Sequence, residues 1–483
     1  MAEFHNFYGG APHPAFEILR NESPGNESVK GQLEESDKDK DVEKKDIKKQ
    51  KEHSVEKVIL PEPDLTVKGK EYLFQHKKGT YLLYYSMLMF FQNGGGPCYI
   101  ISIGDYTEDY DADKMKAGIT QLLKEQEPTM VLIPEAIRLN RQDCVGVQQA
   151  SLAHCGGKMK SRISILDIWE GYKDRHDPSG DCIDNFRNAL GINYLDFAAA
   201  YYPWVNTTII QDKDLGYENI ANKGLLQEIL KEDLEITSGT GTDPKKIQKA
   251  EAVDNIVKED LDDNEKLLLN KTLRMISPSF NIMLKEIKDK LNLLPPGAAM
   301  AGIYTMVDNL RGVWKAPANV SLNGVVSPAV NITHDDQEDL NVTVQGKSIN
   351  AIRAFIGEGV LVWGARTLDG NSLDWRYINV RRTMIMLEES IRLATKAYVF
   401  ENNNANTWVT IKSMINNFLT GIWKRGGLAG SSPGDAFSVH VGLGETMTPE
   451  DILEGILRVT VLVAITRPAE FIEITFQQQM QKS

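Results

Sequence analysis

The hydrophobic positions of the chain change their period several times, and each period predicts a different kind of element. Residues 81–91, 98–103 and 129–133 are short apolar runs bounded by Gly and Pro. Such runs are typical of core strands, or of a strand and a buried helix. Residues 113–125 repeat apolar side chains at helical spacing. Strands that alternate with amphipathic helices predict an α/β layer in this part of the chain.

The middle of the chain follows a second pattern. Between residues 210 and 294, Leu and Ile recur at helical spacing among many Lys, Asp and Glu residues. Pro244 and Pro278 stand at good helix starts, and two consecutive prolines end the block. A run of helices between two α/β stretches is typical of a domain inserted into a loop, where insertions cost little. We therefore expect an inserted helical domain.

The C-terminal part returns to short strands and then predicts two long helices. Residues 379–400 place an apolar stripe on one face and charges on the other, and a second helix is expected at 407–423. Residues 459–466 are apolar on both faces, whereas residues 471–476 alternate apolar and polar side chains. Pro468 prevents a tight ladder between these two segments. The last segment therefore predicts a strand that needs a partner elsewhere.

The N-terminal residues are too polar to form a core of their own. Residues 15–20 predict one short strand, because Phe16 and Ile18 alternate with small or charged neighbours. Residues 30–57 hold 9 Lys and 9 acidic residues with almost nothing apolar, so ordering them buries too little surface. We interpret this stretch as a linker or a solvated helix. An electrostatic docking arm is the alternative, although the charges cancel and create no field of one sign.

Composition and charge exclude several classes of protein. The 483 residues are 42% hydrophobic and 25% charged, unlike collagen-like or wholly disordered chains. The 54 Lys and Arg against 67 Asp and Glu give a net charge of −13, which argues against a general binder of nucleic-acid backbones. The longest apolar runs are far shorter than the ~20 residues of a spanning helix, so we expect no membrane insertion. Four cysteines without a CxxC pair are typical of a reducing compartment.

The sequence contains no motif that predicts catalysis or cofactor binding. The glycine-rich residues 93–97 lack the Lys and Ser or Thr of a phosphate-binding loop. Cys144, His154, Cys155 and His176 are soft ligand types, but their spacings match no zinc pattern. We therefore predict no catalytic residue, no metal and no cofactor. Two alternatives of another class are a metal-dependent enzyme that uses these four side chains and a soluble binding module that uses the inserted helical block.

Several stretches resemble the contractile tail sheath family of phages, pyocins and injection systems. They are GIYTMVDNLRGVWKAPAN at 302–319, GEGVLVWGARTLDGNSLDWRYINVRR at 357–382 and RPAEFIEITFQQ at 467–478. In addition, FFQNGGGPCYI at 90–100 is similar to sheath proteins of extracellular contractile injection systems of the antifeeding-prophage type. The resemblance covers most of residues 72–205 and 297–483.

The resemblance implies an α/β (α+β) fold in which the N- and C-terminal parts together form the inner sheath domain. An outer helical domain is inserted, and both ends of the chain are strand-exchange arms. The expected parts are an N-terminal arm at 1–29, a charged linker at 30–57, the first part of the sheath domain at 58–209, the inserted outer helical domain at 210–296, the C-terminal part of the sheath domain at 297–466 and a C-terminal strand-donating arm at 467–483.

The resemblance also implies a structural role without enzymatic activity. A sheath polymerises helically as stacked hexameric rings around an inner tube, and it contracts to drive the tube through a target envelope. The implied partners are further copies of the chain, the inner tube protein, and baseplate and cap or terminator proteins, with no nucleic acid and no direct membrane insertion. Assembly is expected in the bacterial cytoplasm, as part of a phage-tail-like particle that is released or membrane-anchored. The sheath of a contractile phage virion is the alternative within this class.

Two sets of residues carry these expectations. Terminal arms are expected to add strands to the sheets of neighbouring subunits, where main-chain hydrogen bonds supply affinity and alternating side chains fix the register. The exchanged residues are Phe471, Ile472, Glu473, Ile474, Thr475 and Phe476 at one end and Phe16 and Ile18 at the other. The residues expected to face the tube are Arg381, Arg382, Glu388, Glu389 and Arg392. The alternatives are an edge strand packed on its own domain, and charges that pair along the helix or face water.

Overall fold

The chain folds into two compact units. The structure, a computed structural model, describes residues 1–21, 62–236 and 244–470. Unit 1 contains Met1–Ala11, Tyr81–Ile209 and Asn292–Ser483, and unit 2 contains Pro12–Thr80 and Ile210–Leu291. The predicted linker at 30–57 and the predicted strand at 471–476 lie outside the described residues.

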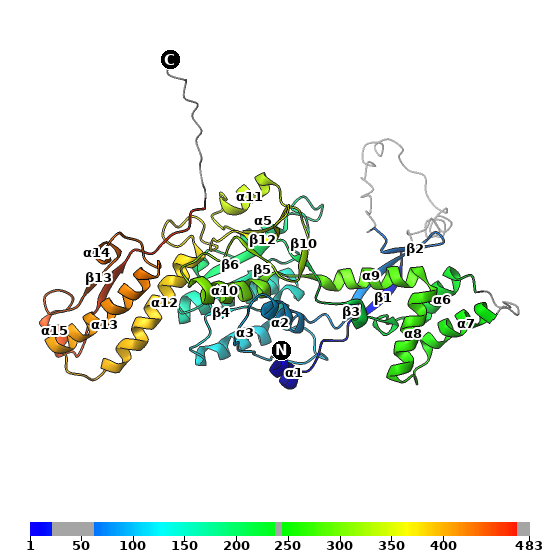
Figure 1. The fold of residues 1–483 in the computed structure, drawn as a ribbon, viewed down its shortest axis with the longest axis horizontal. Helices are drawn as coiled ribbons and strands as arrows, with labels where there is room; N and C mark the ends of the chain where they lie inside the picture. The colour runs from blue at the N-terminus through cyan, green and yellow to red at the C-terminus, as the bar shows by residue number, and fades with distance from the viewer. Residues whose placement is uncertain (22–61, 237–243, 471–483) are drawn as a thin grey trace, which may run out of the picture. The chain divides into compact units, whose positions relative to one another are not determined.

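Unit 1 is built on a six-stranded sheet, of which Figure 1 labels β4, β5, β6 and β12, with colours from cyan at β4 to yellow-green at β12. The strand order is β4-β5-β6-β11-β12-β9. The strands are β4 (Met130–Val131), β5 (Ile163–Asp167), β6 (Ala198–Tyr202), β11 (Asn350–Phe355), β12 (Gly359–Trp363) and β9 (Val320–Ser321). The first four run parallel, and the last two join antiparallel. Every residue of β5 and β6 is buried, as in strands that are covered on both faces.

Helices cover both faces of this sheet (Figure 1). On one face, Phe186 of α5 (Cys182–Ala189) belongs to a core cluster with alternate residues of β6. On the other face, the hydroxyl of Tyr201 lies 2.6 Å from that of Tyr304 on α10 (Gly297–Arg311). Neighbouring residues of a strand point to opposite faces, so each strand serves both helical layers.

Unit 1 contains further helices and two small sheets. The helices are α1 (Ala2–Tyr8), α2 (Leu83–Gln92), α3 (Ala112–Gln121), α4 (Arg141–Leu152), α11 (His334–Asn341), α12 (Ile378–Thr395), α13 (Ala405–Lys424), α14 (Pro433–Ala436) and α15 (Pro449–Leu453). One small sheet joins β10 (Val325–Pro328), β7 (Val205–Thr207) and β8 (Leu293–Leu294), and another joins β13 (Phe437–His440) and β14 (Thr460–Val463). The apolar run at 81–91 is thus a helix, and α12 and α13 correspond to the two predicted long helices. Helix α13 and strand β13 share a core of their own.

The predicted strand at 98–103 has no regular secondary structure. Ile101 and Ile103 pack beside Gly118 of α3 instead of joining a ladder. The neighbouring strand β4 pairs with β5 and has no second partner among the described strands. Cys98, Tyr99 and Ile103 are exposed, so the apolar run marked neither a buried segment nor a paired strand here, because periodicity does not report hydrogen bonding.

A glycine sets the packing of α2 against α10. A Cβ at Gly302 would collide with the carbonyl oxygen of Phe90 and would lie 2.9 Å from the Cβ of Asn93. Real Cβ atoms do not approach other atoms so closely, so the first residue of the stretch at 302–319 has to be Gly for these helices to meet.

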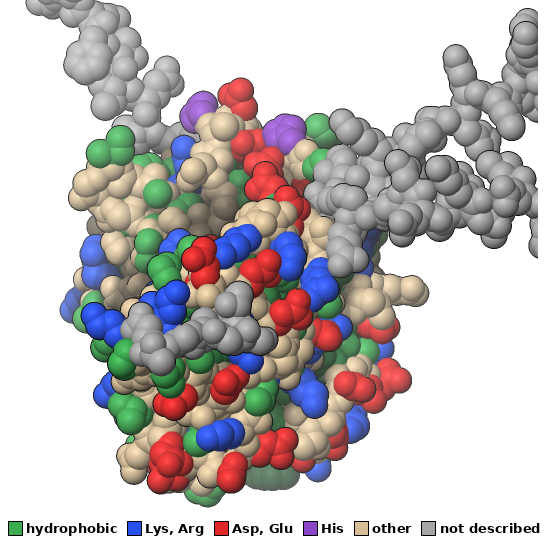
Figure 2. Space-filling view, turned by 90° about the vertical axis from the view of Figure 1, so that its right-hand side faces the viewer, with side chains coloured by type: hydrophobic (Ala, Val, Ile, Leu, Met, Phe, Trp, Pro, Cys, Tyr) green, Lys and Arg blue, Asp and Glu red, His purple; other side chains and the backbone are tan. Residues whose placement is uncertain are grey.

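Unit 2 combines a small sheet with a helical block. An antiparallel sheet joins β1 (Ala15–Arg20), β3 (Lys70–Lys78) and β2 (Leu65–Val67), with β3 in the centre. The helices are α6 (Lys223–Asp233), α7 (Pro244–Asp254), α8 (Asp263–Ile276) and α9 (Pro278–Asn292). Lys and Arg side chains are interspersed with Asp and Glu on the face that Figure 2 shows, without a patch of one sign. Because β2 and β3 belong to unit 2, the predicted first part of the sheath domain, 58–209, is divided between the units.

Candidate interaction surfaces

Phe16 and Ile18, predicted to join a neighbour's sheet, are buried within their own chain. Their exposed fractions are 0% and 1%. Ile18 pairs with Phe74 in the ladder between β1 and β3, and the ring of Phe16 stacks on His76 at 4.5 Å. On the other edge of β1, the side chain of Asn222 accepts a hydrogen bond from the N–H of Ile18 at 3.0 Å and donates one to its carbonyl at 2.7 Å. In the single chain, both side chains therefore fill the interior of unit 2, and their exchange with a neighbouring subunit stays a prediction.

Arg381, predicted to face the tube, is buried at the base of α12. Its guanidinium lies between two aromatic rings, 4.3 Å from the centroid of Phe197 and 3.7 Å from that of Trp375. It also forms an ion pair with Asp196, and only 8% of the residue is exposed. Burial lowers the pKa of Arg381, and the charge of Asp196 opposes this shift. The charge is thus used to attach α12 to its own domain.

Arg382 is held in the same way by the neighbouring helix. Its guanidinium donates two hydrogen bonds to Asp308 of α10, at 2.8 and 2.5 Å, and lies 4.8 Å from the ring centroid of Tyr304. Only 6% of Arg382 is exposed. In the single chain, both arginines thus fix the first turns of α12 inside unit 1, and their contact with a tube stays a prediction.

The second half of α12 is exposed and remains available to a partner. Glu389 and Arg392 form an ion pair of 2.5 Å across one turn, with their side chains 29% and 55% exposed. Glu388 lies beside them, and partial burial raises its pKa. Beyond the helix, Phe400 is fully exposed. The expectation that Glu388, Glu389 and Arg392 contact a tube stays a prediction.

The small sheet of β13 and β14 is the second candidate surface. Its register pairs Phe437 with Val463 and His440 with Thr460. Val439 is buried against α13, whereas 58% of Leu462 is exposed. Among residues 1–21, 62–236 and 244–470, no third strand pairs with either strand. A two-stranded sheet is marginally stable alone, and its unpaired N–H and C=O groups are a template for a further strand.

A buried ion pair holds the chain where the described residues end. Arg366, of which 3% is exposed, donates hydrogen bonds of 2.9, 3.1 and 2.6 Å to the carboxylate of Glu470. Tyr377 donates its hydroxyl to the same carboxylate at 3.0 Å. Arg366 also donates to the carbonyl of Asn341 at 2.8 Å. We call Arg366, Tyr377 and Glu470 the arm clamp, because it immediately precedes the predicted C-terminal strand.

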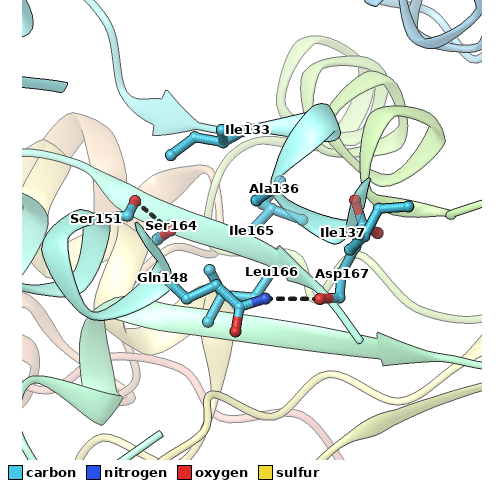
Figure 3. A pocket seen from close by; sticks show the side chains of 9 residues that line it. All are labelled: Ile133, Ala136, Ile137, Gln148, Ser151, Ser164, Ile165, Leu166 and Asp167. Carbon is cyan, nitrogen blue, oxygen red and sulfur yellow. Dashed lines mark hydrogen bonds between the residues drawn. The ribbon is translucent and has the colours of Figure 1, made fainter. Parts of the chain in front are cut away.

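The small cavity in Figure 3 has the volume of about one water molecule. It measures about 10 Å³ and is lined by Gln148, Ser151, Ser164 and Asp167, among others. The carboxylate of Asp167 accepts a hydrogen bond from the N–H of Gly297 at 2.8 Å, and burial raises its pKa to about 7. This carboxylate therefore caps the first turn of α10, and the cavity is too small for an organic substrate.

The structure assembles neither a metal site nor a membrane span from the residues it describes. Burial raises the pKa values of Cys144 and Cys155 to about 12, and it lowers that of His154 to about 4. His154 lies 3.2 Å from a guanidinium nitrogen of Arg162, and His176 pairs with a nearby Asp. No group of three or more His, Cys, Asp or Glu in this part of the chain is placed to hold a metal ion. Within the same residues, every helix is too short or too polar to cross a bilayer.

Comparisons with known proteins identify the part of the chain that contains these surfaces. Residues 371–479 match the family model of the phage tail sheath C-terminal domain. The matched region resembles a tail sheath domain. It includes α12, the sheet of β13 and β14, and two of the three members of the arm clamp.

Relatives extend the similarity beyond this domain. The tail sheath protein of Vibrio phage KVP40 is 25% identical over 193 residues, which are 39% of this chain and 27% of the phage protein. The match thus spans about a quarter of the phage relative. A chain in the 6-fold symmetrised baseplate of the anti-feeding prophage is 28% identical, with coverage of 83% of this chain and 81% of that one and a TM-score of 0.54.

A sheath in a known functional state is similar to the same extent. The sheath complex of PVC, an extracellular contractile injection system, was solved in the contracted state. It is 28% identical, covers 83% of this chain and 81% of its own, and gives a TM-score of 0.52. The resemblance and the mixed α and β fold expected from the sequence are confirmed.

Proposed function

We propose that the chain is a structural subunit of a contractile sheath. It polymerises helically around an inner tube and contracts to drive that tube through a target envelope. The observation that carries this proposal is the similarity to an injection-system sheath over 83% of the chain. The sheath domain also retains a two-stranded sheet that no other described strand completes. The role is mechanical, and we assign no catalytic residue.

The joint between subunits is a donated strand. Residues 471–476 of one copy add to an edge of the sheet of β13 and β14 in a neighbouring copy. The apolar and polar alternation of FIEITF suits this sheet, which packs one face on α13 and exposes the other at Leu462. Main-chain hydrogen bonds supply the affinity, and the alternation fixes the register.

The remaining partners follow from the same assembly. Copies form stacked hexameric rings that surround the inner tube and end at a baseplate and a cap or terminator protein. The particle assembles in the bacterial cytoplasm. The rigid subunits have an extended and a contracted packing. A free-energy difference on the order of a few kcal/mol per subunit between the two is sufficient to drive contraction. No nucleotide is consumed.

The tube contact lies on the exposed half of α12. Glu388, Glu389 and Arg392 offer a small charged surface, and the buried Arg381 and Arg382 hold the helix in place. A modest polar interface grips the tube before contraction and releases it afterwards, which a large apolar interface would not allow.

Deletion of residues 471–483 tests the proposal and leaves the arm clamp intact. The variant and the full chain are each co-expressed with the tube protein and viewed by negative-stain electron microscopy. We expect ridged cylinders from the full chain and only small particles from the deletion. Deletion of residues 479–483 is the matched control, because it spares the stretch that resembles the family. Normal cylinders without residues 471–483 would contradict the donated strand.

A further inference from the structure

The arm clamp connects the end of the described chain to the six-stranded sheet by a short side-chain route. The carboxylate of Glu470 is held by Arg366, which follows β12. The backbone of Arg366 is bonded on both sides to the side chain of Asn350 in β11, through its N–H at 2.7 Å and its carbonyl at 2.8 Å. Asn350 is fully buried. A force applied to residue 471 is therefore transmitted to the buried sheet through the side chains of Glu470, Arg366 and Asn350.

The main-chain route from the same residue is much weaker. It passes back through Thr466, whose hydroxyl donates to the carbonyls of Gly426 and Gly427 at 3.0 and 2.9 Å and whose carbonyl accepts a hydrogen bond from Asn379 at 3.2 Å. The ladder of β14 with β13 extends from Thr460 to Val463, and the main chain of Ala464 adds two hydrogen bonds, at 2.8 and 2.7 Å, so this route consists of neutral hydrogen bonds. Hydrogen bonds of a short ladder that is pulled from one end open one after another, and they are weaker than a forked pair of charges.

The geometry of the clamp suits it to carry load. Arg366 binds Glu470 with two nitrogens, and the side chains are 4% and 17% exposed. Separating them would leave the charge of Arg366 buried without its counterion, which is strongly unfavourable. Tyr377 adds a third donor to the carboxylate. The clamp is therefore expected to stay closed when the chain beyond it is pulled.

We propose that the arm clamp is the load-bearing anchor of the C-terminal arm. It passes the tension of a donated arm to the six-stranded sheet of the donor subunit and keeps this tension away from β13 and β14. Those two strands receive an arm from another copy, so pulling on them would release it. The inference rests on the proposed function, because it assigns the anchor of the donated strand.

The test is the substitution Glu470→Gln, which keeps the shape of the side chain and removes its charge. Variants are co-expressed with the tube protein, contraction is triggered, and the lengths of extended and contracted sheaths are measured by electron microscopy. We expect extended sheaths of normal length and contracted sheaths that are several-fold shorter than those of the unchanged chain, because joints break under load. The matched control Glu251→Gln changes an exposed residue of unit 2 and is expected to leave both lengths unchanged.

A second variant keeps the test decisive if Glu470→Gln does not fold. Tyr377→Phe removes one hydrogen bond and retains the ion pair, so we expect a folded protein with partial breakage on contraction. If Glu470→Gln folds and its contracted sheaths have full length, the proposal that the arm clamp is an anchor is wrong. If Glu470→Gln does not fold, full-length contracted sheaths of Tyr377→Phe lead to the same conclusion. Failure of folded Glu470→Gln to form extended sheaths would overturn the proposal too, since the clamp would then act in assembly. Normal cylinders from the deletion of 471–483 would instead refute the strand exchange itself.

Discussion

Replacing Asp167 by Asn is expected to remove a pH-dependent loss of stability from unit 1. Burial raises the pKa of this carboxyl from 3.8 to about 7. Because the folded state binds the proton more tightly than the unfolded state, the stabilising effect is fully present below pH 4 and is lost as the pH rises to 7. A shift of roughly three pKa units corresponds to about 4 kcal/mol. Asn keeps an oxygen that accepts the hydrogen bond of Gly297 and cannot ionise.

Urea unfolding at several pH values measures this effect. All seven Trp residues lie in unit 1, so tryptophan fluorescence reports the unfolding of that unit. The free energy of unfolding of Asp167→Asn relative to the unchanged chain should rise by up to about 4 kcal/mol between pH 4 and pH 8. Titrations of other groups cancel in this difference. The exposed Asp109→Asn is the matched control, with no such rise. If the free energy of unfolding of Asp167→Asn differs from that of the unchanged chain by the same amount at pH 4 and pH 8, the raised pKa of Asp167 is refuted.

Three further variants test the packing and the surfaces. Gly302→Ala should lower the free energy of unfolding by about 1–3 kcal/mol, because its Cβ has no room beside α2; an unchanged urea midpoint would contradict this. Arg381→Lys keeps the charge but removes the planar group that lies between two aromatic rings. We expect the free energy of unfolding to fall by about 1–2 kcal/mol in the same assay, and tube binding to be normal. The double exchange Glu389→Arg with Arg392→Glu should weaken co-sedimentation with the tube and leave the melting temperature unchanged; equal co-sedimentation would remove this contact.

Local patterns predicted elements well where one face is buried and the other is not. The strand expected at 15–20 is β1, and the helix expected at 407–423 is α13, Ala405–Lys424. Both have a clear alternation of buried and exposed side chains. The segment 98–103 has the composition of a strand, but its hydrogen-bond partners are decided by distant parts of the chain.

Partners across long separations could not be predicted from the sequence. Arg381 and Arg382 stand in a stretch that has the pattern of a solvated helix face, yet their carboxylate partners lie 185 and 74 residues away. Arg366 and Glu470 are 104 residues apart and showed no pattern that would pair them. A charge pattern along one helix does not distinguish a solvated face from a buried ion pair. The same limit explains why the predicted boundary at residue 58 does not coincide with the boundary between the two units at Thr80.

The side chain of Asn222 protects one sheet edge against premature association of subunits. A protein whose copies join through sheet edges can aggregate through any uncovered edge before it assembles. Asn222 satisfies the N–H and the carbonyl of Ile18 as an adjacent strand would, so β1 offers no docking register to a stray copy. With the polar groups of Ile18 satisfied inside the chain, growth of the proposed polymer would not proceed through this edge of β1, and one amide side chain protects it before assembly.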